Sequence, residues 1–298
     1  VSNPEFLAEG SAIFNLEFPD RVLVGGLDSE EGRRAVTKVA SIYKHWVEPS
    51  KIITSGLWSA ELSKLCCNAF LAQRVSSINS LTALCEATGA DIEEVATVLG
   101  SDKRIGSHFL RASVGFGGSC FGKDLLGLIY LCESFHLDDV AEYWRQVLKM
   151  NDFQKQRFSK LIVQTMFDNV KNKNIGILGF AFKKDTGDTR DSAAIDVCKF
   201  LTAEGANLFI YDPKVNHIEI NKLFPKAVCV DSPYSVSFES HAIVILTEWD
   251  EFKNLDYERM HSNMARPSFL FDGRNILDHK KLREIGFKVF AIGKPSET

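Results

Sequence analysis

The sequence predicts an α/β protein that contains a doubly wound, mostly parallel β-sheet. Between Asn174 and Gly293, short apolar runs typical of buried strands alternate with segments of helical periodicity. This alternation is the pattern of strand–helix–strand units, which pack as a parallel sheet covered by helices. The preceding residues instead show helical periodicity, after a single strand and helix near the start. We therefore expect three parts, formed by residues 1–57, 58–167 and 168–298.

The first part predicts the end of an α/β unit. An apolar run at residues 21–25 suits a strand, and apolar residues from Ala35 to Trp46 recur at helical spacing. Pro4 lacks an N–H group and cannot donate to a sheet, so it marks a strand end or a turn, where α/β proteins place binding loops. The chain begins with Val1 rather than Met, and we expect it to be a piece of a longer polypeptide.

The second part predicts a helical region. Apolar residues over 62–78 fit one face of a long helix, and another long helix is expected from about Asp139. Asp91 and Glu94 have the spacing of a capping box, and we expect Gly100 to close the short helix that follows them.

A glycine-rich segment lies between these helices. Residues 115–124 read GFGGSCFGKD, with four glycines in eight positions. Glycine in an ordered segment costs backbone entropy unless a positive φ or a close backbone approach requires it. We therefore expect this segment to be a loop shaped around a contact or a ligand.

The third part predicts six strands, which are the runs NIGILG, NLFIYDP, AVCV, HAIVILTEW, SFLFDG and KVFAIG in chain order. Helices are expected over SAAIDVCKFLTAEG, after the first strand, and over LDHKKLREIG, before the last one. The final KPSET is expected to be a frayed tail.

Composition excludes several classes of protein. Charged residues make up 25% and hydrophobic residues 45% of the chain, which is the balance of a soluble globular protein. The net charge of -4 gives no positive field for nucleic acid or anionic lipid. No apolar run is long enough for a membrane span, and the N-terminal residues lack the pattern of a signal peptide. We expect a cytoplasmic protein that binds neither nucleic acid nor membrane.

The seven cysteines are an odd number with no CxxC pair, which disfavours a disulfide framework and a metal site. Cys120 differs from the others because it lies in the glycine-rich segment, close to Lys123 and Asp124. Backbone amides and a nearby ammonium favour the thiolate, which is the nucleophilic form, and a carboxylate can activate water. Lys64 and Asn68 are four residues apart on the first long helix, where they can act on one oxygen atom or form an ordinary exposed pair.

The loop after the first strand of the third part is a candidate anion site. Lys183, Lys184 and Arg190 lie there, between a parallel strand and a helix N-terminus whose free N–H groups suit a phosphate. Three aspartates are interleaved with these cations, so a solvated charged loop is the alternative. The glycine spacing after this strand is only a partial match to GxGxxG, and it is weak evidence for a dinucleotide.

Five motifs together resemble the nucleotide-sugar 6-dehydrogenase family. They are NPEFLAEG, SKLCCNAFLAQR, GFGGSCFGKD, FAFKKDTGDTRDS and FDGR, in the order and spacing of that family, and the similarity extends from residue 1 to about 293. The animal-type branch acting on UDP-glucose is the most similar. In that family an NAD-binding domain with GxGxxG precedes NPEFLAEG, and it is absent from this sequence.

The resemblance implies an NAD-dependent oxidation of UDP-glucose to UDP-glucuronate on a Rossmann-like fold. In this reaction Cys120 is the nucleophile that forms a thiohemiacetal and then a thioester. Lys64 stabilises the oxyanion with Asn68, and Asp124 positions or activates water. Glu5 takes part in thioester hydrolysis. Glu9 lies between substrate and cofactor.

The resemblance also implies a set of binding residues. The residues expected to contact the UDP-sugar are Phe109, Arg111, Phe116, Gly117, Phe121, Phe182, Lys183 and Arg274. Arg104 is expected to reach the substrate of a neighbouring subunit, and Arg190 and Cys120 to lie by the cofactor. Arg111 stands where lysine is common, so its role at the diphosphate is less direct. The family further implies dimers through the long central helix, which associate into hexamers.

Three alternatives stay open at the level of sequence. The substrate can be another nucleotide sugar, such as a UDP-N-acetylhexosamine or GDP-mannose. The chain can instead be a non-catalytic UDP-sugar-binding or oligomerisation module, because the GxGxxG fingerprint is missing. A cysteine hydrolase is the third, and His108 is the histidine nearest to Cys120 in sequence.

Overall fold

The computed structural model describes residues 1–295 and divides into two compact units, which we describe separately. Unit 1 contains residues 1–70 and 124–141, and unit 2 contains residues 71–123 and the chain from residue 142 onward. The expected frayed tail lies partly outside the described residues, at 296–298. Within the described part, no helix combines the length and the apolar character needed to cross a bilayer.

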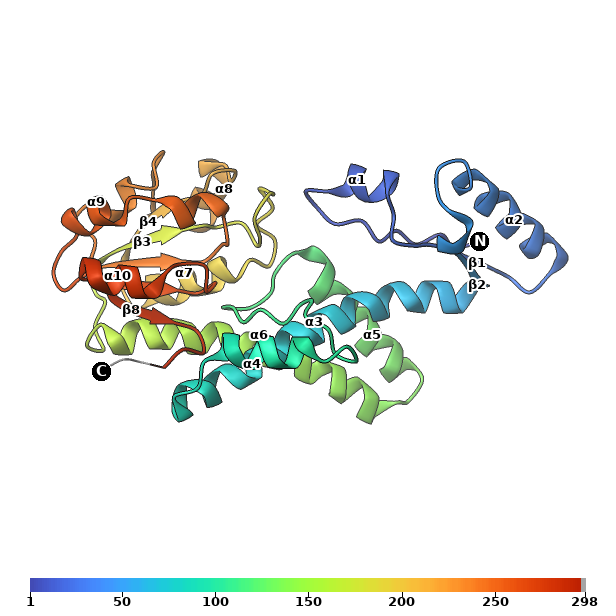
Figure 1. Cartoon of the computed structure of the whole chain (residues 1–298), viewed down its shortest axis with the longest axis horizontal. Helices are drawn as coiled ribbons and strands as arrows, with labels where there is room; N and C mark the ends of the chain where they lie inside the picture. The colour runs from blue at the N-terminus through green and yellow to red at the C-terminus, as the bar shows by residue number, and fades with distance from the viewer. Residues whose placement is uncertain (296–298) are drawn as a thin grey trace. The chain divides into compact units, whose positions relative to one another are not determined.

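Unit 2 contains a six-stranded sheet in which every pairing is parallel (Figure 1). Its strands are β3 (Asn174–Leu178), β4 (Asn207–Tyr211), β5 (Val228–Cys229), β6 (Ala242–Ile245), β7 (Phe269–Asp272) and β8 (Lys288–Ala291). The order across the sheet is β5-β4-β3-β6-β7-β8. This is the doubly wound order, with its topological switch point between β3 and β6. The predicted fold class and all six predicted strands are confirmed.

Short helices connect these strands. They are α7 (Ala193–Ala203), α8 (His217–Leu223), α9 (Tyr257–Ser262) and α10 (His279–Ile285), together with the 3₁₀ turns η2 (Ser235–Ser237) and η3 (Asp250–Asn254). The Ser192 hydroxyl caps α7 by accepting from the N–H of Ala194, which satisfies one of the free donors at the helix start. The sequence predicted α7 and α10. It missed α8 and α9, which have seven and six residues and are too short to show a clear helical period.

The core of unit 2 lies on the central strands. Ile175, Ile177, Ile243 and Leu270 are fully buried, as expected for strands covered on both faces. Burying such side chains contributes roughly 1.5–3 kcal/mol each relative to an exposed position. The continuous apolar runs that predicted these strands therefore also supply the main stabilisation of the sheet.

Unit 2 also contains much of the helical region. The second part of α3 (Leu57–Thr88) and most of α6 (Asp138–Thr165) lie side by side, joined by the bond from the Ser76 hydroxyl to the carbonyl of Val147 (Figure 1). The short helix α4 (Ile92–Ser101) begins at the predicted N-cap, where the Asp91 carboxylate accepts from the N–H of Glu93. The prediction that Gly100 closes α4 is wrong. The helix continues through it to Ser101 and is capped by Asp102, and the glycine is explained by Ser107, whose Cα atom would lie 2.9 Å from a Cβ atom at position 100.

Unit 1 has a small parallel pair of strands, β1 (Val22–Gly26) and β2 (Ile52–Gly56). The helix α2 (Glu30–Tyr43) and the 3₁₀ turn η1 (Pro49–Lys51) connect them. The short helix α1 (Ala12–Glu17) precedes β1. The predicted strand and helix are confirmed as β1 and α2. The sequence missed β2, in which no residue is fully buried, so that it lacks the pattern of a core strand.

Candidate active site

The glycine-rich segment is a loop only in its first half. Residues 115–118 are irregular, and the helix α5 (Ser119–Ser134) begins immediately afterwards, so the expectation of a loop throughout 115–124 is wrong. The glycines have physical reasons. Gly115 and Gly118 have φ of 135° and 86°, which L-residues rarely adopt. A Cβ atom on Gly117 would lie 2.3 Å from the carbonyl oxygen of Asp191, and one on Gly118 would lie 2.8 Å from the Phe182 ring.

Cys120 is the second residue of α5 and is exposed. The other six cysteines are buried or half-buried, and all seven are free thiols. Burial raises the pKa of four of these other thiols, which belong to Cys66, Cys85, Cys198 and Cys229. Cys120 is thus the thiol most accessible to a solvent-borne electrophile, and it lies in the first turn of a helix, where backbone N–H groups have no partner within the helix.

Unit 1 pairs four of the predicted catalytic residues. The Lys64 ammonium lies 3.2 Å from the Glu5 carboxylate, and the Asn68 amide donates a 2.5 Å hydrogen bond to Asp124. Lys64 and Asn68 are four residues apart in α3, so they share a face of that helix. Asp124 is 5% exposed and lies four residues after Cys120 in α5. The helix spacing therefore places these two residues one turn apart on the same side of α5.

Two aromatic and cationic neighbours of this cluster were missed by the sequence analysis. The Phe6 ring lies under the Arg21 guanidinium, at 4.2 Å from its centroid, and 5.5 Å from the Lys64 ammonium. Arg21 also donates to the Cys67 sulfur at 3.4 Å. These contacts hold the N-terminal segment that carries Glu5. The phenylalanine of the NPEFLAEG motif was the one sequence feature that could have indicated them.

Glu9 and His108 lie elsewhere. Glu9 is exposed in the turn before α1, next to Gly10, whose φ is 88°. The backbone carbonyl of His108 accepts from Arg74, and no hydrogen bond joins the His108 ring to Cys120 among residues 1–295. Within the described residues, Cys120 and His108 therefore do not form the hydrogen-bonded pair of a cysteine hydrolase.

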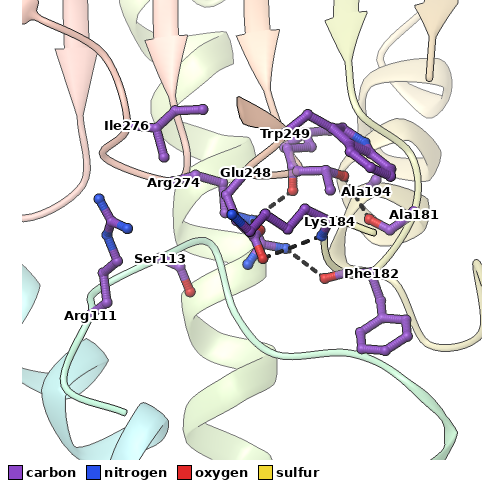
Figure 2. A network of polar contacts seen from close by, with 12 residues as sticks. Arg111, Ser113, Ala181, Phe182, Lys184, Ala194, Glu248, Trp249, Arg274 and Ile276 are labelled. Atoms are coloured by element: carbon purple, nitrogen blue, oxygen red, sulfur yellow. Dashed lines mark hydrogen bonds and ion pairs between the residues drawn. The ribbon is translucent and has the colours of Figure 1, made fainter. Parts of the chain in front are cut away.

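Arg274 is at the carboxyl end of β7, at the centre of a polar network in unit 2 (Figure 2). Its Nε donates to the carbonyl of Leu246 at 2.7 Å, and its Nη2 donates to the carbonyl of Phe182 at 3.0 Å. The same guanidinium lies 3.4 Å from the carboxylate of Glu248. Only 9% of the Arg274 side chain is exposed, so these bonds hold it in one place at the edge of the sheet.

Asp272 supports the turn that presents Arg274. Its fully buried carboxylate accepts from the backbone N–H of Arg274, Ile276 and Leu277, and it lies 2.9 Å from His279 Nε2. A carboxylate with this many donors fixes the backbone of the FDGR segment. The motif letters predicted Arg274 but not the role of Asp272 beside it.

The loop after β3 only partly fulfils the predicted anion site. Lys183 lies over the Phe182 ring at 5.6 Å, whereas Lys184 forms a 2.6 Å ion pair with Asp250. The hydrogen bonds that Lys184 and Lys253 donate lower the pKa of Asp250 to about 2, and the bond to Asp250 raises the pKa of Lys184. Lys184 therefore already has an acidic partner, and its assignment as a cation of the anion site stays a prediction.

Two backbone N–H groups of the loop directly after β3 are occupied. The carboxylate of Asp212, at the end of β4, accepts from the N–H of Phe180 at 2.7 Å, from that of Ala181 at 3.0 Å and from the Trp249 indole at 3.1 Å. Asp212 is 7% exposed. A protein carboxylate thus takes two backbone N–H groups of this loop, and the anion site at this strand end stays a prediction that depends on the N-terminus of α7 and on Lys183.

Aromatic residues surround the glycine-rich loop in unit 2. The rings of Phe116 and Phe121 pack edge to face at 5.6 Å, and that of Phe109 lies 6.5 Å from Phe121. Arg111 donates to the backbone carbonyl of Asn275 at 3.4 Å, just after Arg274. Figure 2 shows Arg111 and Arg274 on facing segments. The structure therefore brings together the predicted binding residues of unit 2 from three segments distant in sequence.

Two predicted arginines have acidic partners of their own. Arg104 forms a two-pronged ion pair with Asp102, at 2.5 Å from its Nη2, and these hydrogen bonds lower the pKa of Asp102 and raise that of Arg104. Arg190 makes the same arrangement with Asp188, with a shortest distance of 2.6 Å. The backbone of Arg190 accepts from the N–H of Gly118, which attaches this loop to the glycine-rich segment.

The junction of β1 and α2 does not fit the diphosphate of a dinucleotide. Glu30 and Glu31 occupy the first turn of α2, Asp28 precedes it, and the Ser29 hydroxyl takes the N–H of Gly32. Carboxylates at a helix N-terminus repel a phosphate from the position where backbone N–H groups would bind it. The β1–α2 junction is therefore not a phosphate cradle.

The doubly wound parallel sheet has a buried arginine at a strand end and is preceded in the chain by a helix whose second residue is an exposed cysteine, and the family to which this combination belongs is a family of nucleotide-sugar dehydrogenases. Three models of the UDP-glucose/GDP-mannose dehydrogenase family match the chain: the NAD binding domain over residues 1–47, the central domain over 58–153 and the UDP binding domain over 176–279. The chain belongs to this family.

Curated relatives include the UDP-glucose 6-dehydrogenase of Gallus gallus, which is 56% identical over 99% of this chain and 62% of its own length. UDP-glucose 6-dehydrogenase 3 of Oryza sativa subsp. japonica is 54% identical, over 99% of this chain and 66% of its own length. The chain thus spans a little under two thirds of these relatives.

Solved structures agree with this family. A UDP-glucose dehydrogenase from the hyperthermophilic archaeon Pyrobaculum islandicum matches with a TM-score of 0.85 and 32% identity, over 99% of this chain and 63% of its own. A UDP-D-ManNAc dehydrogenase from Pyrococcus horikoshii matches with a TM-score of 0.82 and 25% identity, over 99% of this chain and 65% of its own.

Proposed function

We propose that this protein takes part in the NAD-dependent oxidation of UDP-glucose to UDP-glucuronate, with Cys120 as the covalent nucleophile. The observation that carries the proposal is the exposed Cys120 in the first turn of α5, directly after a glycine-rich loop pressed against Phe182 and Asp191. The 56% identity to UDP-glucose 6-dehydrogenases supports UDP-glucose as the substrate. Three parts, at residues 1–57, 58–167 and 168–298, then serve the cofactor, catalysis and UDP-sugar binding.

The UDP-sugar binds to unit 2 in this proposal. Arg274 and Lys183 meet the diphosphate, because a guanidinium and an ammonium at a strand end attract phosphate oxygens. The remaining contacts to uracil, ribose and glucose come from Phe109, Arg111, Phe116, Gly117, Phe121 and Phe182. Arg104 reaches the substrate of a neighbouring subunit.

The proposed chemistry oxidises a primary alcohol to a carboxylate and removes two hydrides. NAD would supply the hydride acceptor for both oxidations, and Arg190 and Glu9 are the residues that would lie on its side of the substrate. The Cys120 sulfur adds to the carbon of the 6-aldehyde, and the Lys64 ammonium and Asn68 amide donate hydrogen bonds to the resulting oxyanion. After the second oxidation, water attacks the thioester carbon and expels the Cys120 thiolate. Asp124 accepts the proton of that water, and Glu5 assists this hydrolysis.

A second function is favoured by the acidic start of α2. Because Asp28, Glu30 and Glu31 repel a diphosphate, the start of α2 does not suit the phosphates of NAD. The second proposal is therefore a UDP-sugar-binding and oligomerisation module without hydride transfer. In either case we propose dimers that associate into hexamers, and sedimentation velocity measures that state.

Calorimetry separates these proposals. The 298-residue chain is titrated with UDP-glucose, UDP-N-acetylglucosamine, GDP-mannose and NAD in turn. The proposed substrate predicts that UDP-glucose binds at least about tenfold more tightly than the other two sugars, a difference of about 1.4 kcal/mol. Tight binding of NAD by the same chain would contradict the module.

Substitution of the cysteine tests the covalent step. Cys120→Ala and Cys120→Ser are compared with Cys229→Ser, which changes a half-buried cysteine, and formation of UDP-glucuronate from UDP-glucose and NAD is measured. The nucleophile predicts loss of net uronate formation in both Cys120 variants. Unchanged turnover in both would exclude the mechanism.

A further inference from the structure

Three buried amide side chains hold the backbone of the glycine-rich loop. Asn79, Asn151 and Gln154 are at most 4% exposed, and each bonds to the main chain of residues 113–116. These residues come from α3 and α6, and all of them lie in unit 2. The backbone polar groups of Ser113 and Phe116 thus bond to side chains, whereas those of a strand bond to the backbone of a neighbouring strand.

Asn151 makes the most complete of these contacts. Its Oδ1 accepts from the N–H of Phe116 at 2.9 Å, and its Nδ2 donates to the carbonyl of the same residue at 3.0 Å. One amide therefore satisfies both polar groups of one residue, as the backbone of a paired strand does. A Cβ atom on Gly115 would lie 2.9 Å from Asn151 Oδ1, so the contact also explains a glycine at position 115.

Gln154 is oriented by a second layer of bonds. Its Nε2 donates to the carbonyl of Ser113 at 2.9 Å. Its Oε1 accepts from Thr82 and Arg157, each at 3.3 Å, and Arg157 in turn forms a 2.5 Å ion pair with Glu86. Because these donors occupy the oxygen side of the amide, the NH₂ group must face the loop. The same Ser113 is held on its N–H by Asn79, at 2.9 Å.

The held segment leads directly to the proposed nucleophile. Phe116 packs on Phe121, which follows Cys120 in the first turn of α5. Gly117 and Gly118, between Phe116 and that helix, are pressed against the loop of Phe182 and Asp191. The chain from Phe116 to Cys120 therefore has little freedom, and its starting point is fixed by Asn151.

We propose that Asn151, supported by Gln154 and Asn79, is a positioning residue that sets the glycine-rich loop for UDP-sugar binding and for the approach of Cys120. The part that concerns the sugar depends on the proposed function, since Phe116 and Gly117 are its proposed contacts. Asn151 touches neither substrate nor cofactor and acts only through the backbone of Phe116.

The isosteric substitution Asn151→Asp tests this proposal. It keeps an acceptor for the Phe116 N–H but places a carboxylate oxygen against the Phe116 carbonyl, where a donor is needed. Asn174→Asp is the matched control. Asn174 is a half-buried amide in the same unit that bonds to Asn207 and Glu239, and it is the first residue of β3, at the end of the strand that does not lead into the Phe182 loop. Three quantities are measured: the unfolding midpoint, the dissociation constant of UDP-glucose, and the rate of Cys120 alkylation by iodoacetamide, followed by peptide mass spectrometry.

Asn151→Asp is expected to weaken UDP-glucose binding by at least about tenfold and to change the alkylation rate of the folded chain by at least about threefold, as loss of a buried hydrogen bond at a rigid site implies. The control is expected to leave both values unchanged even where its unfolding midpoint falls. A role in stability alone would lower the midpoint and leave the alkylation rate as in the unsubstituted chain, which would overturn the proposal.

The two proposals fail in different ways. If the unsubstituted chain does not bind UDP-glucose, the proposed function fails, while the alkylation rate still decides whether Asn151 positions Cys120. If Asn151→Asp does not fold, Gln154→Met is measured in the same way. This substitution removes the hydrogen bonds of Gln154 to Ser113, Thr82 and Arg157 and leaves those of Asn151 in place. Unchanged binding and alkylation in that folded variant would overturn the proposal.

Discussion

Asn68 donates a 2.5 Å hydrogen bond to the carboxylate of Asp124, and this bond joins α3 to α5 within unit 1. Asp124 is 5% exposed, so its charge is held largely away from bulk water. The stability of a buried carboxylate depends on its hydrogen-bond donors, because after removal of a donor the free-energy cost of taking the charge out of water is no longer offset. The two residues proposed to handle the oxyanion and the water are therefore also a structural pair.

This pair predicts a measurable coupling. Asn68→Ala and Asp124→Ala are each expected to lower the free energy of unfolding by about 1–3 kcal/mol, since each leaves a polar group without its partner. The double variant is expected to be less destabilised than the sum, with a coupling of about 0.5–3 kcal/mol in urea unfolding. Asn254→Ala, an exposed amide with a 3.4 Å contact, is the control and is expected to stay within about 0.5 kcal/mol. Strict additivity at Asn68 and Asp124 would contradict the coupling.

The close approach of Gly118 to Phe182 gives a second prediction. Gly118 and Gly89 have similar positive φ angles, 86° and 78°, but only Gly118 has a neighbour within reach of a Cβ atom. Gly89→Ala is expected to cost about 1–2 kcal/mol from backbone strain alone. Gly118→Ala is expected to cost about 1–3 kcal/mol more, because the Phe182 ring must move. Thermal and urea unfolding of the two variants provide the comparison, and equal losses would show that the loop is not packed as described.

Acid titration provides a third prediction, at Asp250. Hydrogen bonds from Lys184 and Lys253 lower the pKa of Asp250 to about 2, below the value of about 4 expected in the unfolded chain. Because the folded pKa is the lower one, the contribution of this pair to stability is present above about pH 4 and is lost as the pH falls toward 2. The slope of unfolding free energy against pH over this window is expected to be shallower in Asp250→Asn. The effect is small, since the pair is exposed to solvent. Identical slopes in the two proteins would contradict the assignment.

The sheet of unit 2 was predictable because its strands are buried on both faces. Such strands are continuous apolar runs, as in β6, and their period and length stand out from the surrounding chain. The start of α5 was not predictable in the same way. Four glycines indicated a loop, yet one of them, Gly122, lies within the first turns of a helix that is stabilised by its packing.

The supporting polar residues were not predictable from the sequence. Asp212 reaches Phe180 and Asn151 reaches Phe116 across more than thirty positions of the chain. Single buried polar residues have no period, and their partners are backbone groups that every residue carries. Residues within a motif, such as Cys120, could be found by their resemblance, whereas the residues that hold the motif in place required the fold.

Arg274 provides the last prediction, because its position rests on the shape of its guanidinium. Two of its nitrogens donate to the carbonyls of Leu246 and Phe182, which lie on different segments, and the group also faces Glu248 (Figure 2). A lysine keeps the charge but cannot bridge the two carbonyls with one compact ammonium. Arg274→Lys is therefore expected to weaken UDP-glucose binding by at least about tenfold, about 1.4 kcal/mol, and to lower the unfolding midpoint slightly.

Arg259→Lys is the matched control for this substitution, since the Arg259 guanidinium lies 4.3 Å over the Tyr234 ring, on α9. It is expected to leave the dissociation constant of UDP-glucose unchanged in calorimetry. If Arg274→Lys bound the sugar as tightly as the unsubstituted chain, charge alone would be sufficient at this position. The two carbonyl contacts would then serve the fold of the sheet edge and not the recognition of the diphosphate.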